Sequence, residues 1–135
     1  MKISVNLPWL MNKEERGYVL EYKENGNVIG NLTVGNVPPH VLEHPEVQGK
    51  KGAALSFSIS RKYQRRGLMY EAVSAVIGQL FQEGVDYING GYFDFNVASE
   101  KLHGKLGFHY LMQETFDRNG ETVNCVECIL WKNRR

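Results

Sequence analysis

Apolar and polar residues follow two kinds of spacing along this chain, one typical of strands and the other of helices. Alternation over residues 18–22 and 28–34 flanks Asn25-Gly26, a dipeptide that accepts the positive φ angles of a tight turn, so this region predicts an antiparallel hairpin. From Leu68 to Glu83 apolar residues recur at helical spacing, and Gly84 supplies a stop. This stretch predicts an amphipathic helix with one face on a sheet.

The same patterns predict the remaining elements. These are a strand at 55–59, a helix at 96–105, and a second hairpin with strands at 108–116 and 121–131. Residues 3–7 alternate like an edge strand, and residues 10–15 are expected to form one turn of helix. The run 87–95 leaves two interpretations open. Its Asn89-Gly90-Gly91 fits a hairpin turn, or a single strand that another group approaches closely.

The predicted order, β-β-loop-β-α-β-α-β-β, indicates an α/β fold in a single domain over residues 1–135. Each strand-helix-strand unit is a right-handed crossover between parallel strands, whereas the hairpins are antiparallel. We therefore expect a mixed sheet of about six to seven strands with helices on its faces. Ligands of such sheets bind beyond the carboxyl ends of parallel strands, where residues 64–67 and 96–99 both lie.

Composition argues against several classes of protein. The chain has 16 Lys and Arg against 15 Asp and Glu, so its bulk charge gives no reason to expect a nucleic-acid or membrane partner. No apolar stretch approaches the length that spans a bilayer, and the N-terminus lacks the layout of a signal peptide. We expect a cytoplasmic enzyme or binding domain in which any cationic site is local.

The two cysteines are spaced like a redox or zinc pair. Cys125 and Cys128 fall, however, in a segment that reads as a strand, where this spacing points the two thiols to opposite faces. A second pair that would complete a zinc site is not present in the sequence. Two reduced structural cysteines are therefore expected.

The segment 36–52 is rich in proline and glycine and has little periodicity, so we expect an exposed loop. Its His40, Glu43 and His44 are candidate substrate-binding residues and, with Glu46, candidates for a general base. The first three also imitate the spacing of metal ligands. The neighbouring prolines argue against the helix that would align them, so no metal is expected.

A short basic turn before the helix at 68–83 carries the strongest functional signal. Residues 63–67 feed a helix N-terminus, where N–H groups without intrahelical partners and the helix dipole favour a phosphate. The sequence Gln64-Arg65-Arg66-Gly67-Leu68-Met69 resembles the acetyl-CoA pyrophosphate loop of the GNAT acetyltransferases, although Met69 stands where that motif prefers glycine or alanine. Asn96-Val97-Ala98-Ser99 and Lys105-Leu106-Gly107-Phe108 resemble the later N-x-x-S and K-L-G-F motif of the same superfamily.

This resemblance implies a GNAT-like fold that binds acetyl-CoA. Backbone N–H groups of residues 65–69 would cradle the pyrophosphate, and the pantetheine arm would lie between splayed strands at 55–60 and 92–95. A backbone N–H of Phe57 or Ser58 would face the developing oxyanion. The implied cofactor-binding residues are Phe57, Ser58, Ile59, Gln64, Arg65, Arg66, Gly67, Leu68, Met69, Asn96 and Ser99.

The resemblance also implies two candidate catalytic residues, Ser99 and His103. Ser99 matches a serine placed to protonate the departing thiolate. His103 stands where many relatives have a tyrosine as general acid, and the plainer interpretation is a histidine on the helix surface. Asn96 is a candidate contact of the pantetheine arm, an N-cap of the following helix, or both.

The sequence of residues 66–72 most resembles the branch related to ribosomal-protein N-terminal acetyltransferases. The implied reaction transfers an acetyl group from acetyl-CoA to a primary amine, either a protein N-terminus or a small molecule. Two alternatives stay open: a noncatalytic acyl-CoA-binding domain, and a basic loop that binds RNA. Few residues precede the first hairpin, so the acceptor site is expected to be abbreviated, cut short, or completed by a second subunit in a homodimer.

Overall fold

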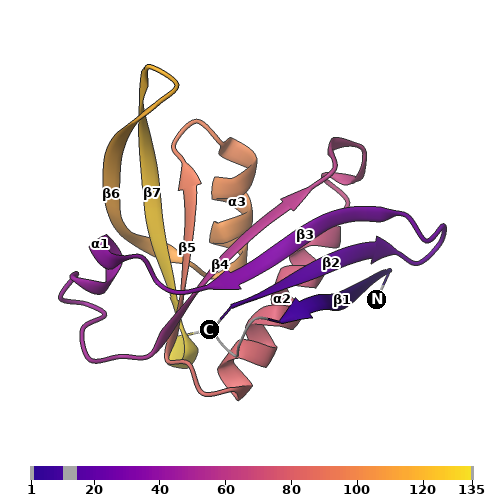
Figure 1. Cartoon of the computed structure of the whole chain (residues 1–135), viewed down its shortest axis with the longest axis horizontal. Coiled ribbons are helices and arrows are strands. Elements are labelled where there is room, and N and C mark those ends of the chain that lie inside the picture. Colours follow the sequence, from indigo (N-terminus) through magenta and orange to yellow (C-terminus); the bar gives the residue numbers. More distant parts are fainter. Residues whose placement is uncertain (1, 11–14, 135) are drawn as a thin grey trace.

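A seven-stranded mixed sheet forms the centre of the molecule (Figure 1). The computed structural model describes residues 2–10 and 15–134, and the strand order is β1-β2-β3-β4-β5-β7-β6. The strands are β1 (Ile3–Leu10), β2 (Arg16–Tyr22), β3 (Val28–Gly35), β4 (Gly52–Ile59), β5 (Tyr87–Phe93), β6 (His109–Arg118) and β7 (Glu121–Trp131). The helices are α1 (Pro39–Leu42), α2 (Leu68–Gln82) and α3 (Val97–Leu106), with 3-10 turns at Arg61–Tyr63 and Lys132–Arg134.

Both predicted hairpins are confirmed. β2 pairs with β3 around the turn that contains Gly26, at φ +73°, and β6 pairs with β7. β4 and β5 are parallel, as expected for strands joined through a helix. The predicted α/β fold with a mixed sheet is therefore confirmed, and residues 3–10 form an edge strand antiparallel to β2.

The strand pairing decides between the two interpretations of residues 87–95. β5 is one strand, because residues from Tyr87 to Phe93 pair without interruption with Trp131 to Cys125 of β7, so the hairpin interpretation of Asn89-Gly90-Gly91 is wrong. A single turn of helix is expected from the sequence at 10–15. Leu10 is instead the last residue of β1, and residues 11–14 lie outside the described part of the chain.

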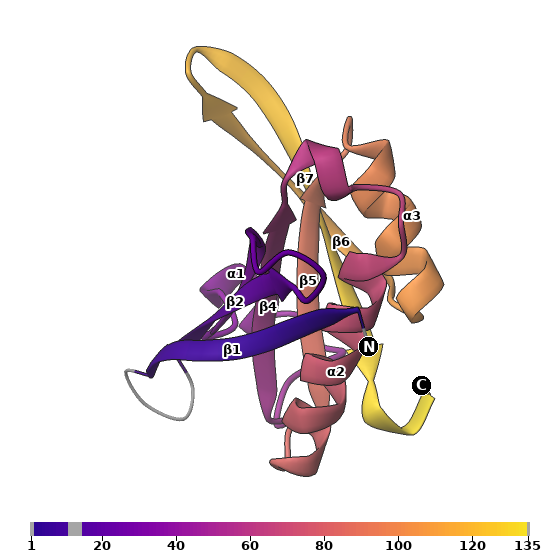
Figure 2. The ribbon, with the colours of Figure 1, turned by 90° about the vertical axis from the view of Figure 1, so that its right-hand side faces the viewer.

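Helices α2 and α3 cover one face of the sheet, and α1 lies on the other (Figure 2). The main core lies beneath α2, whose buried residues include Val73, Val76 and Leu80. A second cluster lies under α1 and joins Val37, Val41 and Val47 to Tyr87, Leu111 and Ile129. The expectation of a wholly exposed loop at 36–52 is thus wrong, because its valines bury against β5, β6 and β7.

The cysteines occupy opposite faces of β7, as predicted. Cys128 is buried in the main core, where desolvation raises the pKa of its thiol to about 12. Cys125 is half-buried on the other face, and burial also raises the pKa of its thiol. Both thiols stay protonated at neutral pH, which suits structural residues. Within the described residues, no helix has the length and apolar character needed to cross a membrane.

Candidate active site

A cleft opens where β4 and β5 separate. The two strands pair only from Gly52 to Ala54 with Tyr87 to Asn89, after which β4 stays with β3 and β5 stays with β7 (Figure 1). The cleft has a volume of about 500 Å³. It is lined by Asn36, Pro38, Ala54, Leu55, Ser56, Phe57, Asn89, Gly90, Gly91, Tyr92, Phe93, Asn96, Ser99, Cys125 and Glu127.

The backbone of β4 is open toward this cleft at alternate residues. The N–H of Ser60 donates to Ile29 of β3 at 2.7 Å, and the carbonyl of Lys51 accepts from the β5 side at 2.7 Å. In an extended strand the N–H and C=O of one residue point the same way, and successive residues alternate. Odd-numbered residues of β4 therefore face the cleft, so the N–H of Phe57, rather than that of Ser58, points toward an occupant.

The basic turn leads into an uncapped helix end. Gly67 stands at the N-cap of α2 with φ +75°, no side chain caps this end, and the space where a Cβ of Gly67 would lie is open. Leu68 and Met69 bury their side chains in the core. Only backbone N–H groups are thus presented at the start of α2, as anion binding at a helix N-terminus requires.

Contacts with neighbouring strands hold the basic turn in place. Tyr63 is buried, its hydroxyl accepts from Asn25 Nδ2 at 3.1 Å, and the Arg66 guanidinium lies 5.2 Å from its ring centre. Gln64 Nε2 donates to the carbonyl of Ile59 at 3.3 Å. Arg65 and Arg66 are exposed, so their charges are available near the uncapped helix end.

Asn96 caps α3 from the opposite wall of the cleft. Its Oδ1 accepts from the backbone N–H of Ser99 at 3.0 Å, which confirms the N-cap interpretation. Its Nδ2 has no partner among the described residues. The cap therefore uses only the acceptor half of the amide and leaves a donor at the cleft.

His103 is buried, so the interpretation as a surface histidine is wrong. Its ring stacks on Phe57 at 5.1 Å and contacts Tyr92 and Phe108, each at 5.2 Å between ring centres. Burial lowers its pKa below the ordinary 6.5, and a hydrogen bond to the Ser99 backbone opposes that shift. The imidazole is consequently neutral at physiological pH.

The hydrogen bonds of His103 define its tautomer. Nδ1 lies 2.8 Å from the Ser99 carbonyl oxygen, which can only accept, so Nδ1 carries the proton. The Ser99 hydroxyl is also close, at 3.3 Å, but a protonated nitrogen cannot accept from it. The Ser99 hydroxyl hydrogen is therefore available to a group in the cleft.

A cluster of His40, Glu114 and Glu127 lies on the other face of the sheet, and sequence reasoning missed its two carboxylates. His40 Nε2 lies 2.5 Å from Glu127 Oε2 and 3.0 Å from Glu114 Oε2. Glu127 is 7% exposed and also accepts from Asn89 Nδ2 at 3.3 Å. We call these three residues the proton-transfer cluster, after the role that we propose for them below. An available signal was the acidic residue at 127 inside the otherwise apolar run 125–131 of β7.

The other loop candidates lie apart from this cluster. Glu43 is exposed at the end of α1, and His44 Nδ1 accepts from the N–H of Glu46 at 3.1 Å. His40 was expected in a loop without helix, but Pro39 at the first position starts a single helical turn that carries it. Three possible ligand atoms of the proton-transfer cluster lie within 4.8 Å of one another, and the absence of a metal remains a prediction.

The loop after α1 is tied to β6 and β7 through Glu46. Glu46 Oε2 accepts from Trp131 Nε1 at 3.1 Å and lies 2.9 Å from His109 Nε2. The hydrogen bond with His109 holds the pKa of Glu46 below its ordinary value. This contact fixes the segment that brings His40 to Glu127.

The adjacent glycines Gly90 and Gly91 make room for groups on opposite faces. A Cβ on Gly90 would lie 2.8 Å from His103, and a Cβ on Gly91 would lie 2.9 Å from Glu127 Oε1. The close approach expected from these glycines is confirmed in this sense. Because neither glycine has a side chain, His103 and Glu127 can both pack directly against the backbone of β5, one on each face.

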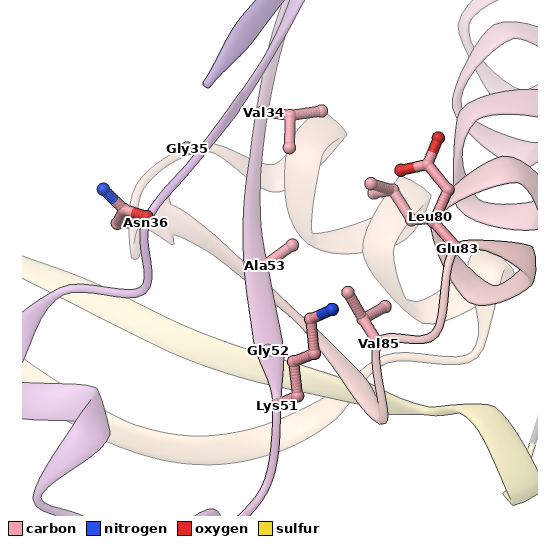
Figure 3. A pocket seen from close by; sticks show the side chains of 9 residues that line it. All are labelled: Val34, Gly35, Asn36, Lys51, Gly52, Ala53, Leu80, Glu83 and Val85. Carbon is pink, nitrogen blue, oxygen red and sulfur yellow. The ribbon is translucent and has the colours of Figure 1, made fainter. Parts of the chain in front are cut away.

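A second cavity lies at the other end of β4, beside the end of α2 (Figure 3). Its volume is about 40 Å³, and its walls are mainly aliphatic, with Lys51 and Glu83 as the charged residues. Glu83 is already engaged by the buried guanidinium of Arg16. This space suits a few water molecules at most, so it is no competitor to the cleft.

The splayed sheet, the uncapped helix end and the flanking polar groups define a protein built to hold an elongated, phosphate-bearing ligand. Residues 2–109 match the family described as the acetyltransferase (GNAT) domain, and the chain belongs to this family. The family resemblance inferred from the sequence is confirmed. No curated protein matches the chain.

Solved structures with the same fold include three relatives of low sequence identity. Ribosomal-protein-S5-alanine acetyltransferase from Vibrio fischeri is 19% identical, with a TM-score of 0.74 over 90% of this chain and 64% of that one. The structure of yncA from Salmonella typhimurium with its cofactor acetyl-CoA is 21% identical, with a TM-score of 0.69 over 87% of this chain and 64% of that one. Mycobacterium smegmatis RimJ with CoA-disulfide is 15% identical, with a TM-score of 0.73 over 89% and 54%. The chain thus spans less than two thirds of the length of these relatives.

Proposed function

We propose that this domain transfers an acetyl group from acetyl-CoA to a primary amine. One observation carries the proposal. The cleft between β4 and β5 is lined by Ser99 on one side and Glu127 on the other, and β4 leads through the basic turn to the uncapped start of α2. A thioester bound there would lie between a proton donor and a proton acceptor, which is what aminolysis of a thioester requires.

Acetyl-CoA fits the groups that the chain presents. The N–H groups at the start of α2 and the charges of Arg65 and Arg66 suit its pyrophosphate. The open edge of β4 suits the amides of its pantetheine arm, in the manner of an added strand, and Asn96 Nδ2 offers one further donor. The Salmonella relative was solved with acetyl-CoA, which supports this choice of ligand. When bound, acetyl-CoA supplies an activated acyl carbon.

The proton-transfer cluster is proposed as the general base. An amine acceptor arrives protonated, and Glu127 and Glu114 attract the ammonium. Glu127 is held between Asn89 and His40, so a proton taken up there is shared with His40 Nε2 and Glu114. A lysine side chain, with pKa near 10.4, costs about 3 kcal/mol more to neutralise at pH 7 than an α-amine near 8. The cluster therefore suits an α-amine acceptor best, and the Vibrio relative named for an alanine acceptor agrees.

On the opposite wall, Ser99 is proposed as the general acid and Phe57 as the oxyanion donor. The Ser99 hydroxyl keeps its hydrogen for the leaving thiolate because His103 Nδ1 is protonated. Since His103 bonds to the backbone of Ser99 and is enclosed by aromatic rings, it is proposed to position Ser99 rather than to donate a proton itself. The cleft-facing N–H of Phe57 supplies a preorganised donor for negative charge.

Titration calorimetry with acetyl-CoA, followed by thiol release with peptides and small amines, tests this proposal. Gly67→Glu should abolish cofactor binding by placing a carboxylate in the phosphate cradle. Gly67→Ala is the matched control, because it carries the same cost of a side chain at positive φ without the charge. Equal affinities of these two variants would refute the position of the cradle.

Ser99→Ala should bind acetyl-CoA normally and turn over about 100-fold more slowly, the lower range for a general acid, because a thiolate leaves readily. Ser74→Ala, at a half-buried position of α2, controls for loss of a helix hydroxyl. Binding without turnover on any amine would favour a noncatalytic acyl-CoA-binding domain. If acetyl-CoA does not bind at all, both functions are rejected and RNA becomes the ligand to test.

A further inference from the structure

Three phenylalanines from different segments gather at one end of the cleft. Phe93 ends β5, Phe95 lies in the turn before α3 and is 62% exposed, and Phe116 lies in β6 and is 42% exposed. The Phe93 ring is nearly parallel to that of Phe95 at 5.4 Å and tilted against that of Phe116 at 6.0 Å between ring centres. We call Phe93, Phe95 and Phe116 the aromatic patch. Single exposed apolar residues are ordinary, but a gathered set marks a contact surface.

The strand register places the aromatic patch beside the proton-transfer cluster. Phe93 pairs with Cys125, which pairs in turn with Glu114, so the three form one row across β5, β7 and β6. Phe116 stands two residues beyond Glu114 on the same face. Two residues along a strand span roughly 7 Å. An amine at the carboxylates would thus place a substituent a few bonds away on the aromatic rings.

The cleft meets the aromatic patch at Phe93. Phe93 lines the same cleft as Ser99 and Glu127, and its register with Cys125 places it on the face of the sheet opposite the core that contains Cys128. Coenzyme A would enter from the start of α2, on the other side of the sheet. The end of the cleft at Phe93 is therefore left to the acceptor.

Arg118 narrows the choice of acceptor. Its guanidinium carbon lies 4.7 Å from the ring centre of Phe93, and no carboxylate of the described residues forms a salt bridge with it. A cation at this position repels a second positive charge on the acceptor. Diamines and basic side chains are disfavoured there, whereas an uncharged ring or aliphatic chain is not.

We propose that the aromatic patch binds an aromatic or large aliphatic substituent that the acceptor amine carries a few bonds from its nitrogen. This inference rests on the proposed acetyl transfer and specifies its acceptor class. Stacking of aromatic rings contributes beyond the area that they bury, and a difference of 1.4 kcal/mol corresponds to about tenfold in selectivity. Arylalkylamines and peptides with an aromatic first residue share this chemistry.

Thiol release is measured with 2-phenylethylamine, ethylamine and 1,4-diaminobutane, and with tetrapeptides that begin with Phe or Gly. We expect kcat/KM to be at least about tenfold higher for 2-phenylethylamine than for ethylamine, and lowest for the diamine. Phe95→Ala and Phe116→Ala should each raise KM for 2-phenylethylamine. The ratio of its kcat/KM to that of ethylamine should then fall toward one. A preference for the aromatic substrate that is seen only among the peptides, or only among the small amines, shows which of these two kinds of acceptor the domain uses.

Tyr110→Ala is the matched control, because Tyr110 is also 62% exposed but pairs with Cys128 on the helix-covered face. Selectivity that is absent, or that survives in both patch variants, overturns the inference and leaves the proposed function standing. Patch variants that change only self-association in sedimentation would also overturn it.

A binding measurement keeps the two proposals separate. If no amine is acetylated, acetyl transfer fails, and 2-phenylethylamine is titrated into the coenzyme A complex. Affinity that falls about tenfold in Phe116→Ala, but not in Tyr110→Ala, supports the aromatic patch as a binding site. Absent or unchanged binding overturns it.

Discussion

Replacing Gly90 with alanine tests how β5 accommodates the buried imidazole. The added Cβ would lie 2.8 Å from Cδ2 and Nε2 of His103 and 3.2 Å from the ring of Phe108. The imidazole has little room to move, because Phe57 and Tyr92 enclose it at ring-centre distances of 5.1 and 5.2 Å. The backbone of β5 or the last turn of α3, which carries His103, must therefore shift.

The expected cost combines two opposing effects. Overpacking of a filled core typically destabilises by about 1–3 kcal/mol, whereas replacing a strand glycine with alanine restores about 0.5–1 kcal/mol. We expect the free energy of unfolding of Gly90→Ala to fall by about 1–2 kcal/mol. Gly35→Ala is the matched control, since Gly35 also lies in a strand and its Cβ would meet nothing within 4 Å.

Urea unfolding followed by circular dichroism measures both variants. Gly35→Ala should be as stable as the parent or slightly more stable. In a double-mutant cycle, Gly90→Ala should cost less in a His103→Ala background, because the smaller side chain leaves space for the new methyl group. Equal stability of Gly90→Ala and Gly35→Ala, or strict additivity in the cycle, would refute the packing argument.

Three further predictions concern protonation and hydrogen bonding. Burial holds the pKa of His103 below 6.5, so the unfolded chain binds a proton at this residue at a higher pH than the folded chain does. The free energy of unfolding should therefore fall as the pH drops below 6.5. A His103→Phe variant should show a weaker fall over that range. Because the pKa of Glu46 is lowered, its contacts contribute stability above the ordinary value of 4.5, and this contribution is lost as the pH falls below that value. In a Trp9→Phe background, which leaves Trp131 as the tryptophan, Glu46→Gln should increase the quenching of Trp131 fluorescence by acrylamide. Glu43→Gln should not. Asn96→Asp keeps the oxygen acceptor that caps α3 and removes the Nδ2 donor. Calorimetry should show an affinity for acetyl-CoA that is lowered by up to about tenfold, while the free energy of unfolding stays unchanged. An equal loss of stability in Asn96→Asp and Asn96→Ala would contradict this division of roles.

Most of the fold follows from local signals in the sequence. Asn25-Gly26 marks one hairpin, and Gly84 and Gly107, at φ +102° and +100°, mark the ends of α2 and α3. These signals act over a few residues, so periodicity and turn chemistry are enough to read them. The uncapped start of α2 belongs to the same group, because Gly67 and its arginines are adjacent in the sequence.

The proton-transfer cluster could not be predicted in this way. His40, Glu114 and Glu127 come from α1, β6 and β7, and their meeting depends on the order in which β5, β7 and β6 pair. His103 raised the same difficulty, since α3 has polar residues on most of its surface. Its burial depends on rings from β4 and β5 and on the missing side chain of Gly90.

The two walls of the cleft are held by different kinds of contact, and this separates the geometry of the site from the stability of the fold. The wall with Ser99 is fixed by the aromatic packing around His103, which is continuous with the main core. The wall with His40 depends on the segment 36–52, whose valines pack in the second cluster and whose polar contacts to β6 and β7, through Glu46, are exposed. Exposed polar contacts contribute little to global stability, so changes at Glu46 should loosen the proposed base while the core stays intact. Changes around His103 should affect both, because there the packing of the core and the position of the proposed acid are the same set of contacts.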